Sequence, residues 1–355
     1  MKKENYHIIG VMSGTSLDGI DIAEIKFHIS EKGNWSYQLV QAETIPYSHF
    51  WKKELQDAIH YSKPQLERLD FKYTEQLAEY ISAFIKKHKI NEINAVCSHG
   101  HTILHQPDKG FTLQIGNLPK LAKLLSQTVV CDFRVQDVEL GGQGAPLVPI
   151  GDKLLFSEYD YCVNLGGFAN CSFEENGERI AYDICPVNIV LNYYSEKLGK
   201  DFDEGGKLSA SGRINQPLLK QLNQLEFYSE NPPKSLGLEW VNSFIFPLLE
   251  SANLSSEDIL RTFVEHIAVQ LAPQFSKNSS VFITGGGVYN NFLIERLKSF
   301  SSIEIVIPSS EIIEYKEALI FGLLGVLKLR GEVNCLASVT GAKKDHSGGR
   351  IYSNK

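Results

Sequence analysis

A strand-like apolar run that leads directly into a turn of glycines and hydroxyls constrains this chain more than any other feature. The run covers residues 7–12, and six of the twelve residues from Gly10 to Asp21 are Gly, Ser or Thr. Apolar side chains at Ile20, Ile22 and Phe27 then indicate a second strand. Because only six or seven residues separate the two runs, the pattern predicts a hairpin with the polar turn at its tip.

Two later strand-like runs are likewise followed directly by glycine-rich turns. NLGGFAN covers residues 164–170 and ITGGGVYNN covers residues 283–291. Glycine lets backbone N–H groups approach a ligand closely, and successive inward-pointing N–H groups bind anions. One such turn is more often simply a tight turn, and the chain has neither a Walker phosphate loop nor a GxGxxG fingerprint. Three of them together favour a polyphosphate clamp.

The first turn also offers side-chain ligands. Ser13, Thr15 and Ser16 carry hydroxyls that can donate to phosphate oxygens. Asp18 or Asp21 can hold Mg²⁺ through water, because Mg²⁺ loses its hydration shell reluctantly. The turn therefore predicts a site for a nucleotide and its magnesium ion.

Composition narrows the class of protein. The 355 residues suffice for two domains, and 43% apolar with 22% charged residues is typical of a soluble globular protein. A formal charge of −7 argues against nucleic acid or an acidic membrane as partner. No apolar run approaches the roughly 20 residues of a membrane span, and the N-terminus does not resemble a signal peptide. The six cysteines lack CxxC spacing, so we expect buried, reduced thiols in a cytoplasmic protein.

The order of elements suggests two similar halves. Each half begins with a strand, a glycine turn and two further strands, and continues with helices, the clearest of which spans 255–271 with Ser255 and Asp258 as a capping pair. The stretch GGQGAPLVP, residues 141–149, is the best linker candidate. We therefore expect an N-terminal domain of residues 1–133 plus about 341–355, and a C-terminal domain of residues 134–340. Glycine hairpins in two such halves are the plan of the actin/sugar kinase/Hsp70 (ASKHA) superfamily.

A more specific resemblance rests on motifs spread over nearly the whole chain. The sequence resembles the anhydro-N-acetylmuramic acid kinase family in GVMSGTSLDGIDIA, SHGHTILHQP, CDFRVQDVELGGQGAPLVP, NLGGFANCSF, YDICPVN, PPKSLGLEW, TGGGVYNNFL, KEALIFGLLG and SVTGA. The resemblance implies an α/β fold of two ASKHA (RNase H-like) domains around a central cleft. It also implies cleavage of a 1,6-anhydro ring, transfer of the γ-phosphoryl of ATP to O6, Mg²⁺ as cofactor, a cytoplasmic role in cell-wall sugar recycling, and a homodimer.

Within YDICPVN, Asp183 matches the catalytic aspartate of the family. A carboxylate there can take a proton from the water that attacks C1. The alternative interpretation is a cap for a helix that starts near Pro186. Cys185 and Val187 stand where the family usually has glycine, and a β-branched residue does not adopt positive φ cheaply. This departure puts the identity of the substrate in doubt.

Other residues are carried over from the family motifs. Arg134 suits the lactyl carboxylate of the muramic sugar, although an intramolecular Arg–Asp pair is about equally plausible. His99, His101 and His105 could suggest zinc, but no further ligand completes such a site, and the motif places SHG near the substrate. The substrate-binding candidates are His99, Asp132, Arg134, Asp137, Gln143, Asn188 and Glu317. The nucleotide-binding candidates are Met12, Ser13, Gly14, Thr15, Ser16, Leu17, Asp18, Gly19, Gly166, Gly167, Asn170, Gly285, Gly286 and Gly287.

Two alternatives to this function stay open. A levoglucosan-type kinase would keep the fold and act on an anhydro sugar without a lactyl group, which would leave Arg134 only a structural role. An ATP-binding regulator could have lost the chemistry through Cys185 and Val187, although the retained Asp183 argues for turnover.

Overall fold

The chain folds into two compact units. The computed structural model describes residues 3–14 and 17–353. One unit comprises Met1–Leu155 and Tyr315–Lys355, and the other comprises Phe156–Glu314. These limits differ from the expected boundaries near residues 134 and 340, and residues 141–149 lie within the first unit instead of linking the two. The reason is packing, because a Cβ on Gly151 would lie 2.6 Å from Ile320, so this segment and the C-terminal helix pack together.

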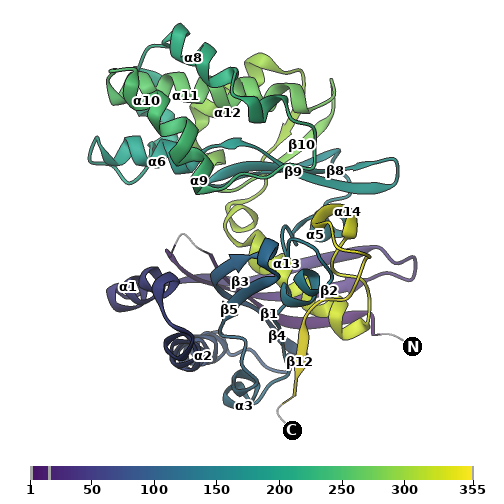
Figure 1. Cartoon of the computed structure of the whole chain (residues 1–355). Coiled ribbons are helices and arrows are strands. Elements are labelled where there is room, and N and C mark those ends of the chain that lie inside the picture. Colours follow the sequence, from purple (N-terminus) through teal and green to yellow (C-terminus); the bar gives the residue numbers. More distant parts are fainter. Residues whose placement is uncertain (1–2, 15–16, 354–355) are drawn as a thin grey trace. The chain divides into compact units, whose positions relative to one another are not determined.

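The first unit is built on a seven-stranded mixed sheet (Figure 1). Its strand order is β12-β6-β4-β1-β2-β3, with β5 paired to β4. β1 and β2 form the predicted antiparallel hairpin, whereas β4 runs parallel to β1 and to β6. The strands are β1 (Asn5–Ser13), β2 (Gly19–Ile29), β3 (Trp35–Pro46), β4 (Ala95–Gln106), β5 (Phe111–Ile115), β6 (Val129–Cys131) and β12 (Arg350–Tyr352).

Helices cover this sheet on both faces. α2 (Lys63–Lys87) starts at a capping box of Ser62 and Gln65 and buries an apolar stripe at helical spacing against one face. α13 (Ser310–Arg330) approaches β1 so closely that a Cβ on Gly10 would lie 2.2 Å from the Ala318 carbonyl oxygen. The remaining helices here are α1 (His49–Asp57), α3 (Lys120–Leu125), α4 (Val135–Glu139), α5 (Pro149–Leu155) and α14 (Ala337–Thr340).

The second unit has a five-stranded sheet in the order β11-β10-β7-β8-β9. Its longest helix, α11 (Ser256–Leu271), begins as predicted at Ser255, whose hydroxyl accepts from the Asp258 N–H at 3.2 Å. The strands are β7 (Tyr161–Leu165), β8 (Phe168–Glu175), β9 (Glu178–Pro186), β10 (Ser280–Thr284) and β11 (Glu304–Val306). The other helices are α6 (Asn188–Glu196), α7 (Lys207–Ser211), α8 (Gln216–Asn223), α9 (Leu238–Trp240), α10 (Phe246–Ser251) and α12 (Asn291–Phe300).

Short single-turn segments complete the chain. They are η1 (Ala58–His60), η2 (Pro107–Lys109), η3 (Glu204–Gly206), η4 (Glu226–Ser229), η6 (Ala272–Gln274) and η7 (Gly286–Tyr289), with a π-helical turn η5 (Val241–Ile245).

The two units share one topology. In each, three consecutive strands form an antiparallel meander, and two later strands extend the sheet in parallel beside the first strand of the meander. This repeat confirms the predicted α/β class with two ASKHA-type units. The six cysteines are all buried, as predicted.

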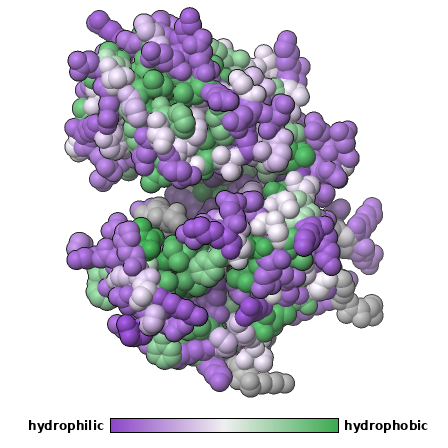
Figure 2. Space-filling model, in the orientation of Figure 1, coloured by the Kyte–Doolittle hydropathy of each residue, from purple (hydrophilic) through white to green (hydrophobic). Residues whose placement is uncertain are grey.

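The surface is mainly polar. Hydrophilic side chains cover much of the face drawn in Figure 2, with hydrophobic residues among them. Among the described helices, none is long and apolar enough to span a membrane.

Candidate active site

The first glycine turn joins β1 to β2, and the serine at the end of β1 is tied into the interior. The Ser13 hydroxyl lies 2.8 Å from Nδ1 of His101 and 2.6 Å from Oη of Tyr47, which in turn lies 2.5 Å from Oη of Tyr73. Burial lowers the pKa of His101 to about 4, so its ring is neutral. If Nδ1 of His101 accepts, the hydroxyl hydrogen of Ser13 is used in this bond; if Nδ1 donates, Ser13 accepts from His101 and either donates to Tyr47 or accepts from it. The Ser13 hydroxyl is therefore part of a buried chain of bonds.

Among the described residues that follow Ser13 in this turn, Asp18 has an exposed carboxylate. Leu17 has φ +60°, and its N–H lies 3.4 Å from the Gly14 carbonyl oxygen. Asp18 is exposed, whereas Asp21 on β2 is half-buried and accepts from the Thr44 hydroxyl at 2.6 Å. Met12 is buried, and a Cβ on Gly19 would lie 2.4 Å from the Ile45 carbonyl oxygen. Thr15 and Ser16, two expected phosphate ligands, lie outside the described residues.

In the second unit the two predicted glycine turns lie side by side. Gly285 has φ +85°, and a Cβ there would lie 2.5 Å from Asn164 Oδ1 and 2.7 Å from the Leu165 carbonyl carbon. A Cβ on Gly287 would lie 2.8 Å from the Leu165 side chain. Only glycine permits this approach, so the loop after β10 closes directly onto the loop after β7. The structure thus brings together residues that the sequence separates by over a hundred positions.

The start of α6 fastens these turns. The Asn188 N–H donates to Gly166 O at 3.2 Å, and the Val187 N–H donates to Gly167 O at 2.8 Å. The Asn188 amide also donates to Leu165 O at 3.2 Å, and Gly286 lies beside it, a Cβ there being 3.7 Å from Asn188 Nδ2. Asn188, expected on the sugar side, therefore contacts the glycine turns expected to bind the nucleotide.

Asp183 lies on β9 opposite Asn170 of β8. Its Oδ2 accepts from the Leu236 N–H at 2.8 Å, and its own N–H donates to Lys234 O at 3.0 Å. Burial raises the pKa of Asp183, and the Leu236 N–H opposes that rise. Helix α6 has Val187 at its N-cap with no side-chain bond, so the helix-cap interpretation of Asp183 is wrong. Among the described residues, Oδ1 has no bonding partner, which leaves one carboxylate oxygen available to a reactant.

Arg134 precedes α4 in the first unit. Its Nε donates to Nε2 of His99 at 2.7 Å, and its Nη1 donates to Gly144 O at 2.7 Å. Nδ1 of His99 lies 2.9 Å from Gly100 O, so Nδ1 carries the hydrogen and Nε2 accepts. Burial, reinforced by Arg134, holds the pKa of His99 well below its usual value. The alternative interpretation, an intramolecular Arg–Asp pair, is not found among the described residues, because neutral groups bond this guanidinium while the charges of Glu317 and Asp137 act on it from a distance.

Asp132 and Asp137, which lie on either side of Arg134 in the sequence, differ in their surroundings: Asp132 lines a pocket and Asp137 is buried. Asp132, with φ +60°, pairs with Arg350 at 3.0 Å and lines a pocket of about 310 Å³ together with Asp70 and Gln114. Burial raises the pKa of Asp132 to about 6, against the effect of Arg350. Asp137 is fully buried and accepts from the Gly144 N–H at 2.7 Å.

Two further candidates stand on the surface of the first unit. Gln143 is exposed, and its N–H donates to Thr340 O at 2.8 Å. Glu317 is exposed on α13, and its negative charge acts on Arg134. The substrate candidates of the first unit therefore do not converge as one set, and those with the clearest geometry are Arg134 and His99.

Comparison with known proteins assigns the family. The model of the family described as anhydro-N-acetylmuramic acid kinase matches residues 6–354. The chain belongs to the anhydro-N-acetylmuramic acid kinase family. It is similar to the anhydro-N-acetylmuramic acid kinase of Coxiella burnetii (strain Dugway 5J108-111), with 34% identity over 374 residues that cover 99% of this chain and 98% of that protein. The enzyme of the same name from Pseudomonas syringae pv. syringae (strain B728a) is 32% identical over 376 residues, covering 98% and 99%.

Among solved structures, component A of (R)-2-hydroxyglutaryl-CoA dehydratase from Acidaminococcus fermentans aligns with a TM-score of 0.49 at 13% identity, covering 92% of this chain and 99% of that one. Membership of the anhydro-N-acetylmuramic acid kinase family makes the chain an enzyme of the kinase class, as the motifs predicted.

The resemblance implies glycine at residues 185 and 187, and the structure has two fully buried side chains there. Val187, the N-cap of α6, has φ −131° and ψ −97°, which lies outside both the extended and the helical regions. Neither residue is among those with positive φ. A β-bulge leaves Ile184 without an opposite partner, because Ala169 faces Cys185 while Asn170 faces Asp183.

Sequence reasoning missed the groups that hold the site residues in place. Tyr47 and Tyr73 complete the bonds of Ser13, and no local pattern marks them as polar partners. The PPKS motif left the role of Lys234 undecided; its Nζ donates to Phe227 O at 3.0 Å, and its backbone carbonyl holds Asp183. The hydrophobic stretch after this motif gave no sign that the Leu236 N–H would bind the carboxylate.

Proposed function

We propose that this kinase opens 1,6-anhydro-N-acetylmuramic acid with water and phosphorylates the freed O6 from ATP, giving N-acetylmuramate 6-phosphate and ADP. The observation that carries the proposal is the Asp183 carboxylate, with Oδ2 held by the Leu236 N–H at 2.8 Å and Oδ1 without a hydrogen-bond partner in the part of the chain that the structure describes. A general base must be held in one orientation and must still offer a lone pair to the water it activates. Asp183 meets both requirements.

In the proposed reaction Asp183 takes a proton from the water as the water oxygen bonds to C1. The bond from C1 to the bridging oxygen breaks, and that oxygen, now O6 of the opened sugar, attacks the γ-phosphoryl group. The raised pKa of Asp183 suits this role, because a stronger base accepts the proton more readily near neutral pH.

The phosphates of ATP are assigned to the glycine turns. Gly166, Gly167, Gly285 and Gly286 are exposed or half-buried in adjoining turns of the second unit, with Gly287 buried beneath them, and this supports an anion-binding role. In the first unit the turn after Ser13 would contribute backbone N–H groups. Bound Mg²⁺ would neutralise phosphate charge, with exposed Asp18 and half-buried Asp21 as its ligands through water.

Arg134 supports a muramic substrate over a neutral anhydro sugar. Its guanidinium is bonded to His99 and Gly144 O, and among the described residues no carboxylate lies at ion-pair distance from it, although the charges of Glu317 and Asp137 act on it. A lactyl carboxylate would give this guanidinium a direct ionic partner, whereas a levoglucosan-type substrate would not. Against the loss-of-chemistry alternative stands the Asp183 carboxylate, which the chain retains and holds through the Leu236 N–H.

The test is release of ADP in a coupled assay with Mg-ATP and 1,6-anhydro-N-acetylmuramic acid, in parallel with levoglucosan. We expect turnover only with the muramic sugar, and a fall of about 10²–10⁴-fold for Asp183→Asn, the range for loss of a general base. Glu178→Gln, an exposed carboxylate on the same strand, is the matched control and should leave the rate unchanged. Turnover on levoglucosan alone would replace the substrate, and an active Asp183→Asn would remove the base.

The cellular setting follows from the same proposal. A kinase for this sugar would act in the cytoplasm, in recycling of the cell wall, and we propose a homodimer on the family resemblance. Size-exclusion chromatography with light scattering tests the dimer, and a monomeric mass at working concentration would refute it.

A further inference from the structure

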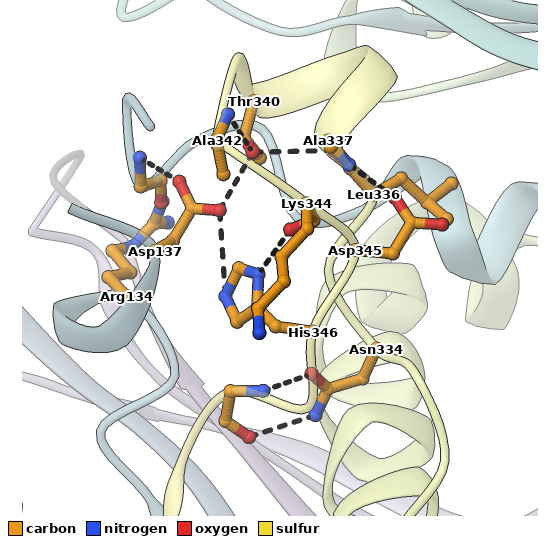
Figure 3. A network of polar contacts seen from close by, with 12 residues as sticks. Arg134, Asp137, Asn334, Leu336, Ala337, Thr340, Ala342, Lys344, Asp345 and His346 are labelled. Carbon is orange, nitrogen blue, oxygen red and sulfur yellow. Dashed lines mark hydrogen bonds and ion pairs between the residues drawn. The ribbon is translucent and has the colours of Figure 1, made fainter. Parts of the chain in front are cut away.

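Three side chains of the first unit, none of them a candidate catalytic base, direct metal-ligand atoms toward one another. They are the Asp137 carboxylate, the Cys335 thiol and the His346 imidazole, whose ligand atoms all lie within 4.8 Å of one another. All three residues are buried, with 0%, 2% and 5% of their surfaces exposed. Figure 3 shows Asp137 and His346 facing each other across this cluster.

His346 is oriented as metal-ligating histidines are. Its Nδ1 faces the Lys344 carbonyl oxygen at 3.3 Å and therefore carries the hydrogen (Figure 3). Its Nε2 is buried without a hydrogen-bond partner and lies 3.6 Å from Asp137 Oδ1. A bare ring nitrogen beside a carboxylate oxygen places two lone pairs together in a dry interior, which is unfavourable unless a cation lies between them.

Asp137 is also held as a ligand would be. Its Oδ2 accepts from the Gly144 N–H at 2.7 Å, and its Oδ1 accepts from the Thr340 hydroxyl at 2.7 Å. Such outer bonds to a carboxylate and to the second nitrogen of a histidine fix the geometry of metal ligands. Cys335 and His346 are joined to each other by backbone bonds of 3.1 and 3.2 Å, so their positions are coupled.

We propose that Asp137, Cys335 and His346 bind a divalent transition-metal ion of the zinc class. Imidazole and thiolate are donors that zinc prefers to the oxygen-only sets of Mg²⁺ and Ca²⁺. Bonds of about 2.0 Å to nitrogen and oxygen and about 2.3 Å to sulfur place tetrahedral ligand atoms roughly 3.3–3.8 Å apart. The 3.6 Å between Nε2 and Oδ1 already fits, and the thiol would close the remainder and release its proton on binding.

Two other interpretations explain less of this geometry. In a nucleophilic triad the carboxylate accepts a hydrogen bond from one ring nitrogen while the other nitrogen faces the thiol, whereas here Asp137 Oδ1 lies 3.6 Å from Nε2, Nδ1 faces the Lys344 carbonyl oxygen, and the thiol is buried. A proton on Nε2 would make an ion pair with Asp137, but 3.6 Å exceeds hydrogen-bond distance.

The metal would brace the loop that orients Arg134. Asp137 holds the Gly144 N–H, and the Gly144 carbonyl holds Nη1 of Arg134. Binding at Cys335 and His346 would fasten the C-terminal segment to this loop. The site is thus structural, and its loss should raise the KM for the sugar more than it lowers kcat.

The experiment measures the metal directly on the full-length protein, purified without chelators or a histidine tag. Elemental analysis after incubation with Zn²⁺ and dialysis should give one equivalent per chain, and Co²⁺ in its place should give a thiolate charge-transfer band. Cys335→Ser should abolish the band, and both Cys335→Ser and His346→Gln should lose the bound equivalent. Cys162→Ser, at another buried cysteine, should retain both.

Circular dichroism verifies that each variant is folded, and the cobalt spectrum of the unaltered protein tests the site even if a variant fails to fold. Absence of both zinc and the cobalt band from the unaltered protein would overturn the proposal in favour of the ion pair. Retention of the band in Cys335→Ser would overturn it as well.

Discussion

Replacing Gly285 by alanine tests the contact between the two glycine turns of the second unit. At φ +85° an alanine costs about 1–2 kcal/mol for its left-handed backbone. Its Cβ would also lie 2.5 Å from Asn164 Oδ1 and 2.7 Å from the Leu165 carbonyl carbon. Because one of these atoms is backbone, relief requires the loops to separate, which adds about 1–3 kcal/mol of overpacking. We expect a total destabilisation of about 2–5 kcal/mol.

Gly177 in the β8–β9 turn provides a matched control. It has φ +84°, and nothing lies within 4 Å of a Cβ placed on it. Gly177→Ala therefore carries the backbone cost of about 1–2 kcal/mol without the clash. Urea unfolding of both variants, followed at the transition of the second unit, isolates the clash as the difference between their unfolding free energies. Equal losses would refute the described packing.

The same pair of variants tests nucleotide binding. If the two turns bind phosphate together, Gly285→Ala should raise the KM for ATP at least tenfold, whereas Gly177→Ala should leave it unchanged. The KM values are compared without denaturant, at a temperature at which both variants are folded. An unchanged KM for ATP in a destabilised Gly285→Ala would separate the turn's structural role from the proposed phosphate role and refute the latter.

Three further predictions follow from single contacts. Arg134→Gln should raise the KM for the muramic sugar by 10²-fold or more with the KM for ATP unchanged, since a charge-assisted bidentate contact contributes roughly 3 kcal/mol; equal effects on both substrates would contradict a carboxylate-binding role. Because the pKa of Asp132 is raised from 3.8 to about 6, its neutral form favours folding, and stability of up to about 3 kcal/mol should be lost as pH rises from 4 to 6. Asp132→Asn should remove that slope in urea titrations, and an unchanged slope would contradict the assignment. Tyr47→Phe removes the bonds of the Tyr47 hydroxyl to Ser13 and Tyr73, leaving Ser13 its bond to His101, and should cost about 1–3 kcal/mol by thermal unfolding; a loss below 0.5 kcal/mol would speak against the buried chain of bonds.

Most of the strands and helices could be predicted from local sequence patterns. The hairpin around residues 13–19 was predictable because strand periodicity and turn residues lie next to each other in the chain. The boundary near residue 134 was not, because a glycine-rich stretch indicates a loop without indicating the unit in which it packs. Residues 141–149 lie in the first unit because contacts from far along the chain hold them there, such as Thr340 O with the Gln143 N–H.

For the site residues too, local sequence predicted identities, whereas contacts from distant parts of the chain set the orientations. Motifs identified Asp183 and Arg134, but their orientation depends on groups distant in sequence, namely the Leu236 N–H for the first and the His99 ring for the second. The cluster of Asp137, Cys335 and His346 gives no signal in the sequence, because about 200 residues separate its aspartate from the other two. Spacing rules for metal sites detect ligands that share a loop or helix, and this set shares neither.

Cys185 and Val187 are side chains at positions where the resemblance implies glycine. Glycine is favoured where φ is positive, and neither residue has positive φ, although φ −131° with ψ −97° places Val187 outside the extended and helical regions. The two side chains instead fill the core beneath the β8–β9 hairpin, whose bulge at Ile184 places Asp183 opposite Asn170. A larger side chain at these positions should therefore stabilise the strand that carries the base. Reversion of Val187 to glycine then predicts lower stability with kcat unchanged, which unfolding and turnover measured on one preparation would decide.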